Sequence, residues 1–316
     1  MSERRRLAAI DIGTVTTRFL VADVGPDGIA EVERSTDITH LGEGLGTGTR
    51  LAPEAMERVA TVIGHYAARI GELDVERVSA VATSASRDAE NADEFRAMLA
   101  ARGIATEVIS GAREAELTFA GTTAETAGEG LLVVDCGGGS TELVLGDVVF
   151  EDAQRSARVL AARSIDVGSR RMTELYLSSD PPSPAALGEA RSWAAAEFRP
   201  FFERLDARPR QMLAVAGTAT SLASIDLELT EYDAALVHGH VLSGAAVTDL
   251  LEMLAALPLE RRRHVVGLHP GRAGVIVAGA LILETVLALA GLDAIVVSEH
   301  DILYGILLDA YRDLQE

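Results

Sequence analysis

The chain has 316 residues, and 28 basic against 48 acidic side chains give it a formal net charge of −20. Lysine is absent, so every basic residue is an arginine, and Cys136 is the single cysteine. Without lysine there is no Walker-type GxxxxGK[ST] loop and no Schiff-base or pyridoxal-phosphate chemistry. One cysteine excludes intramolecular disulfides and cysteine-rich metal centres. The negative mean field argues against sequence-independent nucleic-acid binding.

The length is about twice that of a typical domain, which favours two domains. The N-terminus, MSERRRLAAID, lacks the apolar region of a signal peptide. The most apolar stretch, residues 273–297, is interrupted by Glu284 and Asp293, so it is too short to span a membrane. We expect a buried helix followed by a strand there, in a soluble cytoplasmic protein with no membrane association.

Strands and helices alternate from the first residues onward. The hydrophobic pattern predicts strands at 6–12 and 17–24, and a third after the turn at 26–28. It then predicts a helix at 54–70, a strand at 78–83, a helix at 92–101, a strand at 107–109 and a helix at 112–121. Ser110 is a suitable N-cap for the last of these helices.

Residues 122–130 are small and polar, which is typical of a linker. Beyond it the pattern predicts strands at 131–135, 141–146, 212–215 and 294–297. The expected helices are 171–177, 184–205, 243–257, 273–290 and 301–314. Such alternation predicts α/β domains.

The second half repeats the beginning of the first at an offset of 124 residues. AIDIGTVTTRFLVADV starts at Ala9, and VVDCGGGSTELVLGDV starts at Val133. The alignment pairs Asp11 with Asp135, as well as Gly13 with Gly137 and Thr17 with Thr141. A strand, a glycine turn with hydroxyl residues and a second strand thus occur twice. Two duplicated domains would face these turns toward each other across a cleft.

Glycine turns of this kind expose backbone N–H groups that can hold phosphate oxygens without lysine. An aspartate at a strand end needs a cation between itself and a phosphate. Asp135, together with Glu142 and with Asp11 as a further candidate, therefore suggests Mg²⁺ ligands or residues that hold such ligands. The alternative is that Glu142 is exposed and the glycines only form a hairpin. Two matching turns favour the phosphate interpretation.

At these motifs the sequence resembles the actin-like superfamily and, more narrowly, the Ppx/GppA family of exopolyphosphatases and guanosine pentaphosphate phosphohydrolases. The turns and AGTATSLASID from Ala216 carry the broader resemblance. The narrower one also rests on ATSASRDAEN (82–91), VISGAREAELTFAG (108–121), SIDVGSRRMTE (164–174), HPGRAGVIVAGA (269–280) and VSEHDILYGI (297–306). These segments span nearly the whole chain in the family's order.

The resemblance implies an α/β fold of two actin-like (ribonuclease H-like) domains with an active-site cleft between them. We place the N-terminal domain at 1–126 and the C-terminal domain at 127–316, and the helix at 301–316 can pack back on the first. The chain resembles the short form of the family, without added C-terminal helical domains. Family members are often homodimers, so we expect one here.

The resemblance also assigns site residues. The general base maps to Glu114 in ISGAREA, and the Mg²⁺ carboxylates map to Asp135 and Glu142. The residues expected to bind phosphate are Asp11, Gly13, Thr14, Arg87, Gly137, Gly138, Gly139, Ser140 and Thr141. The possible substrate channel comprises Arg18, Arg113, Arg170, Arg171, Gly217, Thr218 and Arg272. The chain departs from the family at Arg113, where an acidic residue is usual, and at Thr14-Val15-Thr16, where Ser-Asn-Ser is common.

Physical chemistry suits Glu114 as a base. It lies in the first turn of the predicted helix, where the helix dipole favours a carboxylate, and the adjacent Arg113 acts in the same direction. Such a base would orient and deprotonate a water that attacks the terminal phosphorus in line. The alternative is that Glu114 merely stabilises the start of the helix.

Other polar residues allow two interpretations. Arg87, expected in a loop, could contact phosphate or pair with Asp88 or Glu90. The run 261–263 of three arginines is more typical of a solvated surface, and His238 with His240 lacks a third metal ligand nearby. Arg272 is expected at a helix start, a poor place for a cation unless an anion joins it. We expect Cys136 to be a small core residue at a strand end.

We therefore predict a Mg²⁺-dependent exopolyphosphatase that releases terminal phosphate from inorganic polyphosphate. The nearest alternative is guanosine pentaphosphate hydrolysis, which uses the same chemistry. More distant alternatives are an actin-fold kinase and a non-catalytic actin-like scaffold. The polyphosphate interpretation predicts an arginine-lined, locally positive groove on a negative body.

Overall fold

The computed structural model describes residues 4–45, 48–151 and 154–315. The chain divides into two compact units, one of residues 1–124 with 301–316 and the other of residues 125–300. The division follows residue 124, against the predicted 126, and the C-terminal segment belongs to the first unit. Among the helices of the described residues, none has the length and apolar character that crossing a membrane requires.

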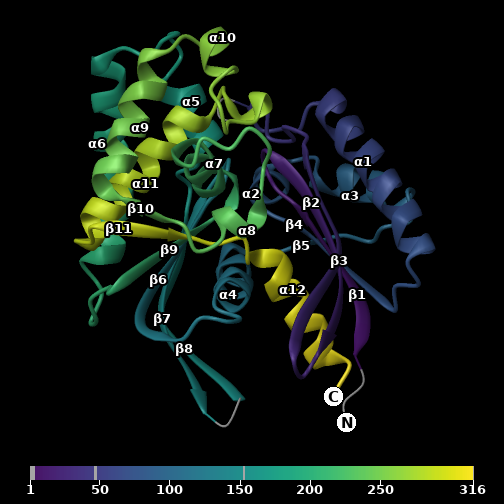
Figure 1. The fold of residues 1–316 in the computed structure, drawn as a ribbon. Helices are drawn as coiled ribbons and strands as arrows, with labels where there is room; N and C mark the ends of the chain where they lie inside the picture. Colours follow the sequence, from purple (N-terminus) through teal and green to yellow (C-terminus); the bar gives the residue numbers. More distant parts are fainter. Residues whose placement is uncertain (1–3, 46–47, 152–153, 316) are drawn as a thin grey trace. The chain divides into compact units, whose positions relative to one another are not determined.

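The first unit contains a five-stranded sheet in the order β3-β2-β1-β4-β5. The strands are β1 Arg5–Ile12, β2 Thr16–Gly25, β3 Gly28–Ile38, β4 Arg77–Ala82 and β5 Glu107–Val108. Strands β1, β2 and β3 form an antiparallel meander, whereas β4 runs parallel to β1 and β5 parallel to β4. Figure 1 shows the meander in purple.

Helices cover both faces of this sheet. They are α1 Pro53–Glu72, α2 Ser84–Asp88, α3 Ala92–Ala100, α4 Gly111–Thr122 and α12 Ile302–Asp313. Side chains of β1 alternate between two cores: Ile10 packs with α1 and α3, and Leu7 packs with α12. Because both faces are buried, the strand is apolar from Leu7 to Ile10 rather than alternating with polar residues.

The second unit contains a six-stranded sheet in the order β10-β11-β9-β6-β7-β8. The strands are β6 Gly128–Cys136, β7 Thr141–Glu151, β8 Gln154–Ile165, β9 Gln211–Val215, β10 Val241–Ser243 and β11 Ala294–Val297. Strands β6, β7 and β8 form an antiparallel meander, while β9 is parallel to β6 and β11 is parallel to β9.

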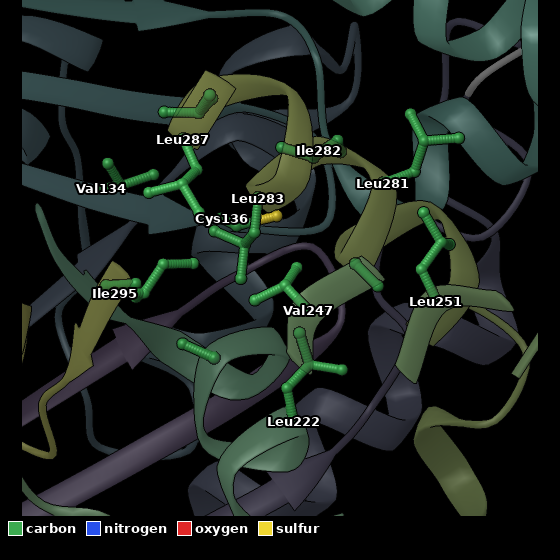
Figure 2. Packing of buried hydrophobic residues seen from close by; sticks show 14 of the residues in the cluster. Val134, Cys136, Leu222, Val247, Leu251, Leu281, Ile282, Leu283, Leu287 and Ile295 are labelled. Carbon is green, nitrogen blue, oxygen red and sulfur yellow. The ribbon is translucent and has the colours of Figure 1, made fainter. Parts of the chain in front are cut away.

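One face of this sheet carries the larger core of the unit. The helices are α5 Ser169–Tyr176, α6 Pro184–Phe202, α7 Ala216–Asp226, α8 Ala234–Val237, α9 Gly244–Ala256, α10 Leu259–Arg262, the 3₁₀ helix η1 Pro270–Arg272 and α11 Ile276–Ala290. Figure 2 shows Leu283 of α11, Val247 of α9 and Leu222 of α7 gathered near Val134 and Cys136 of β6. The apolar stretch 273–297 is thus a buried helix and a strand, as predicted.

The two units repeat one topology, which confirms the internal repeat. Strands β3-β2-β1-β4-β5 of the first unit correspond in order and direction to β8-β7-β6-β9-β11 of the second. The turns match as well: Gly13 N–H donates to Thr16 O at 2.9 Å, and Gly137 N–H donates to Ser140 O at 3.0 Å.

Several elements escape the sequence prediction, among them β8, α7 and α2. Strand β8 alternates poorly because it is an edge strand with most of its residues exposed. Helix α7 is rich in Ser, Thr and Gly, which have low helix propensity, and packing of Ala219, Leu222 and Ala223 in the core stabilises it. Helix α2 is a short helix where a loop was expected.

The prediction that residues 261–263 form a solvated run is wrong for Arg262. Its side chain is buried and donates to three backbone carbonyls, those of Leu254, Leu257 and Ala273, at 2.8–3.0 Å. These carbonyls surround the fixed fork of the guanidinium, so Arg262 ties the segment after α9 to the start of α11.

Candidate active site

In the second unit, two carboxylates lie at the mouth of the glycine turn. Asp135 near the end of β6 and Glu142 near the start of β7 are direct partners in the antiparallel register. Directly opposed residues place their side chains on the same face of a sheet. Both residues are buried, with 6% and 1% of their surfaces exposed. The alternative of an exposed Glu142 is therefore wrong.

Two hydroxyl groups hold one oxygen of Glu142. Ser140 Oγ lies 2.8 Å from Glu142 Oε1, and Ser164 Oγ lies 2.6 Å from the same atom. Ser164 is the register partner of Glu142 on β8. The hydroxyl of Ser140, predicted to bind phosphate, thus serves the carboxylate, and Ser164 is a site residue that the sequence analysis did not find.

The carbonyls of the glycine turn are tied to the start of α5. Ser169 N–H donates to Gly137 O, and Arg170 N–H donates to Gly138 O, both at 2.9 Å. The side chain of Arg171 donates from Nε to Gly139 O at 2.9 Å. These bonds fix the turn through its oxygens, so Arg171, predicted to line a channel, supports the turn.

Neighbouring residues of the turn are similarly fixed. Thr141 Oγ1 donates to Val167 O at 2.5 Å, and the Arg170 guanidinium pairs with Glu174 at 3.2 Å. Gly168 lies so close to the turn that a Cβ would approach Gly138 O to 2.4 Å. Glycine is therefore required at this approach.

The same turn in the first unit carries the opposite charge. Arg18 occupies the position of Glu142 and is the register partner of Asp11. Its guanidinium contacts Asp11 Oδ2 at 2.5 Å and Asp301 Oδ2 at 2.5 Å. Asp301 also caps α12 by accepting the N–H of Leu303 at 2.9 Å. Arg18, predicted to line a channel, joins β2 to the start of α12 through these ion pairs.

Asp11 is 2% exposed, and burial raises its pKa while the charge of Arg18 opposes the rise. Its Oδ1 atom has no hydrogen-bond partner among the described residues. Any role of Asp11 in phosphate binding would therefore also involve Arg18, because the two side chains form an ion pair.

The turn between β1 and β2 is closed by backbone contacts. Thr14 O accepts the N–H of Gly42 at 2.9 Å, and Val15 O accepts the N–H groups of Thr39 and His40, each at 2.9 Å. The side chain of Val15 is buried. The departure at this position thus replaces a polar side chain of the family by one that packs in the interior.

Glu114 lies in the first turn of α4, as predicted. Ser110 caps this helix and accepts the N–H of Arg113 at 3.2 Å. Glu114 is 7% exposed, and Arg87 Nη1 lies 3.0 Å from its Oε2 and 3.2 Å from Ile109 O. Arg87, which lies in α2, thus links the Glu114 side chain to the backbone at Ile109, directly after β5.

Arg113 takes a different direction. Its guanidinium pairs with Asp309 on α12 and with Glu116 at 3.4 Å. The channel role predicted for Arg113 finds no support in these contacts, which bind α4 to α12. The arginine that departs from the family at this position thus contacts α12, and Arg87 contacts Glu114.

Arg272 lies near the end of β9. The guanidinium of Arg272 lies against Gly217, because a Cβ on this glycine would be 0.9 Å from Arg272 Nη1. Thr218, the next residue of α7, is buried against Gly279 of α11. Arg272 ends η1 rather than beginning α11, so the predicted position at a helix start is wrong.

Metal-binding options are few. Within the ranges that the structure describes, no group of three or more His, Cys, Asp or Glu residues is arranged to hold a metal ion. His238 packs on His300 with ring centroids 4.4 Å apart, and His240 Nε2 lies 2.8 Å from Asp226. The opposed pair Asp135 and Glu142 fits Mg²⁺, which often takes one or two carboxylates and completes its shell with water and substrate phosphates.

Comparison with known proteins identifies the class to which this fold and these residues belong. The chain matches the Ppx/GppA phosphatase family over residues 20–313. It belongs to this family, whose structures have two actin-like domains. The predicted fold class is therefore confirmed, and the chain is an enzyme of the phosphoanhydride hydrolase class.

Individual relatives agree with this assignment. Exopolyphosphatase 2 of Mycobacterium tuberculosis is 40% identical over 321 residues, covering 96% of this chain and 98% of the relative. The crystal structure of an exopolyphosphatase-like protein superposes with a TM-score of 0.92 at 36% identity, covering 99% of this chain and 100% of that one. An exopolyphosphatase from Cytophaga hutchinsonii superposes with a TM-score of 0.88 at 26% identity, covering 98% of both chains.

Proposed function

We propose that this enzyme removes the terminal phosphate from inorganic polyphosphate. The observation that carries the proposal is the buried Glu114 carboxylate, clamped by Arg87 in the first turn of α4. The 40% identity to a mycobacterial exopolyphosphatase over nearly the full length supports the substrate class.

In the proposed reaction, Glu114 accepts a proton from water as the water oxygen attacks the terminal phosphorus. The bond from that phosphorus to the bridging oxygen breaks, and the products are orthophosphate and a chain shorter by one phosphate. The base must be ionised at neutral pH, and the guanidinium of Arg87 and the N-terminus of α4 both favour the carboxylate.

We further propose that Asp135 and Glu142 hold Mg²⁺. The support is the donor set: two buried, directly opposed carboxylates beside a glycine turn. The ion would neutralise charge on the transferred phosphoryl group. Backbone N–H groups of Gly138 and Gly139 would bind phosphate oxygens, while the carbonyls of the turn remain tied to α5.

Guanosine pentaphosphate is the alternative substrate, because the chemistry is the same. The position of Arg272 favours polyphosphate. Its guanidinium lies against Gly217, in the segment that resembles the nucleoside-side motif of actin-like proteins. A cation there suits a further phosphate better than an uncharged base.

The decisive experiment measures phosphate release, with Mg²⁺, from long-chain polyphosphate, guanosine pentaphosphate and ATP in parallel. We expect polyphosphate to have the highest kcat/KM. Glu114→Gln should lower kcat by a factor of about 10² to 10⁴. Glu116→Gln, on the exposed side of the same helix, is the matched control and should retain activity.

Equal rates for wild type and Glu114→Gln would exclude Glu114 as the base. A higher kcat/KM for guanosine pentaphosphate would reassign the substrate without changing the mechanism. Phosphate transfer from ATP to an acceptor, with no hydrolysis, would favour the kinase alternative.

A further inference from the structure

We infer that Ser164 is a positioning residue that, with Ser140, fixes the orientation of the Glu142 carboxylate for the cation. This inference rests on the proposed function, in which Glu142 is a Mg²⁺ ligand. The hydroxyls of Ser140 and Ser164 both lie within hydrogen-bond distance of Glu142 Oε1, at 2.8 and 2.6 Å.

The two serines belong to different elements. Ser140 ends the glycine turn, and Ser164 lies on β8 opposite Glu142. Their hydroxyls therefore reach the carboxylate from the turn and from the neighbouring strand. An isolated glutamate rotates freely about its last bond, because that torsion has a broad, roughly two-fold profile. Two donors on a single oxygen restrict this rotation and so define where the other oxygen points.

A metal ligand must be both ionised and correctly oriented. Loss of a group that orients a metal ligand typically weakens metal affinity by a factor of about 10 to 100. One of two hydroxyls should have an effect near the lower limit.

Burial along β8 supports this role. Residues from 156 to 163 are mostly exposed, whereas Ser164 is half-buried and Ile165 is buried. Ser156 lies on β8 eight residues away, opposite Val149 rather than Glu142, and is exposed.

The experiment compares Ser164→Ala, Ser164→Thr and Ser156→Ala in the full chain. Mg²⁺ is titrated into the substrate-free protein while the melting temperature is followed, and the Mg²⁺ midpoint of phosphate release is measured separately. We expect Ser164→Ala to raise both midpoints about tenfold, with kcat at saturating Mg²⁺ much less affected. Ser164→Thr, which keeps the hydroxyl, should restore both midpoints, and Ser156→Ala should leave them unchanged.

Glu142→Gln distinguishes failure of the positioning role of Ser164 from failure of the proposed metal site. If Glu142→Gln raises the Mg²⁺ midpoints but Ser164→Ala does not, positioning by Ser164 is wrong and the metal site stands. If neither variant changes them, Glu142 is not a metal ligand and the inference falls with that part of the proposed function. Failure of Ser164→Thr to recover would also overturn the role of the hydroxyl.

Discussion

At the scale of single residues, the two repeated turns differ by one charge reversal. Asp135 faces Glu142 in the second unit, whereas Asp11 faces Arg18 in the first. The pair Asp135 and Glu142 suits an added cation, while Asp11 already has an arginine as its counter-ion. The repeated backbone therefore carries a candidate metal site in one copy and an internal ion pair in the other.

Replacement of Arg18 should be strongly destabilising. Arg18→Met leaves Asp11 and Asp301 buried without their shared counter-ion, and breaking such a pair costs about 3–5 kcal/mol. Arg50→Met, which removes an exposed pair with Glu94, should change stability by less than about 1 kcal/mol. Urea unfolding at neutral pH measures both, and equal costs would contradict the central role of Arg18.

The deficit of Arg18→Met should depend on pH. Burial already raises the pKa of Asp11, so the folded state binds a proton more readily than the unfolded chain. Loss of the arginine enlarges this difference. Stability relative to wild type should therefore be lowest above the pKa of Asp11 and should recover as the pH falls through it. Urea midpoints across this range test the sign, and a deficit that grows with acidity would contradict it.

Cys136 should be chemically inert in the folded protein. Burial is the main cause that raises the pKa of its thiol, to about 12, so almost no thiolate forms near neutral pH. Iodoacetamide at mildly alkaline pH should leave native protein unmodified and label the urea-unfolded chain fully, as mass spectrometry would show. Rapid labelling of the native protein would mean that the strand end opens.

The sequence located the candidate residues in the fold better than it predicted their partners. Asp135 and Glu142 became candidates because each lies beside the glycine turn, whereas the proposed role of Glu114 came from the family resemblance. Ser164 was missed because its relation to Glu142 depends on strand β8, which the hydrophobic pattern does not reveal. Arg262 was misinterpreted because three consecutive arginines look solvated, and only folding brings three carbonyls around one of them.

At the scale of elements, α4 and α12 pack unusually closely through two glycines. A Cβ on Gly121 would lie 1.9 Å from Asp301 O, and one on Gly305 would lie 1.9 Å from Leu117 O. Both obstacles are backbone atoms, which cannot turn aside as a side chain can. The ion pair between Arg113 and Asp309 joins the same two helices.

Alanine at these glycines should therefore force the helices apart. We expect Gly305→Ala to cost about 3 kcal/mol, at the upper end for overpacking. Gly188→Ala, at an exposed helical position with open space around it, should be neutral or stabilising by up to about 1 kcal/mol. Thermal or urea unfolding of the two variants compares them directly, and a neutral Gly305→Ala would refute the close contact.

The strands and long helices were predictable because their periodicity is strong and their caps are local. Helix α1 and strand β1 follow hydrophobic runs with clear boundaries. Helix α7 was not predictable, because its small polar residues become helical through burial against Leu222 and its neighbours. Such stabilisation comes from packing at long range and leaves little trace in local propensity.

At the scale of the whole molecule, the charge of −20 opposes the proposed polyanionic substrate. Two effects then compete: the mean field repels polyphosphate, and individual arginines with Mg²⁺ attract it. Added salt screens whichever effect dominates. We expect local attraction to dominate, so the KM for long-chain polyphosphate should rise several-fold between about 50 and about 300 mM KCl at fixed Mg²⁺. A KM that falls with salt would show that repulsion controls binding.

The discontinuity of the first unit has a consequence for synthesis of the protein. Asp301 binds Arg18 across 283 residues of sequence, and α12 supplies Leu303 and Leu307 to the core that contains Leu7 and Leu20. On the ribosome, the second unit is continuous and can fold as soon as it emerges. The N-terminal part of the first unit cannot complete its hydrophobic core until α12 has been synthesised. A chaperone that binds exposed apolar segments would therefore be expected to hold the N-terminal half longest.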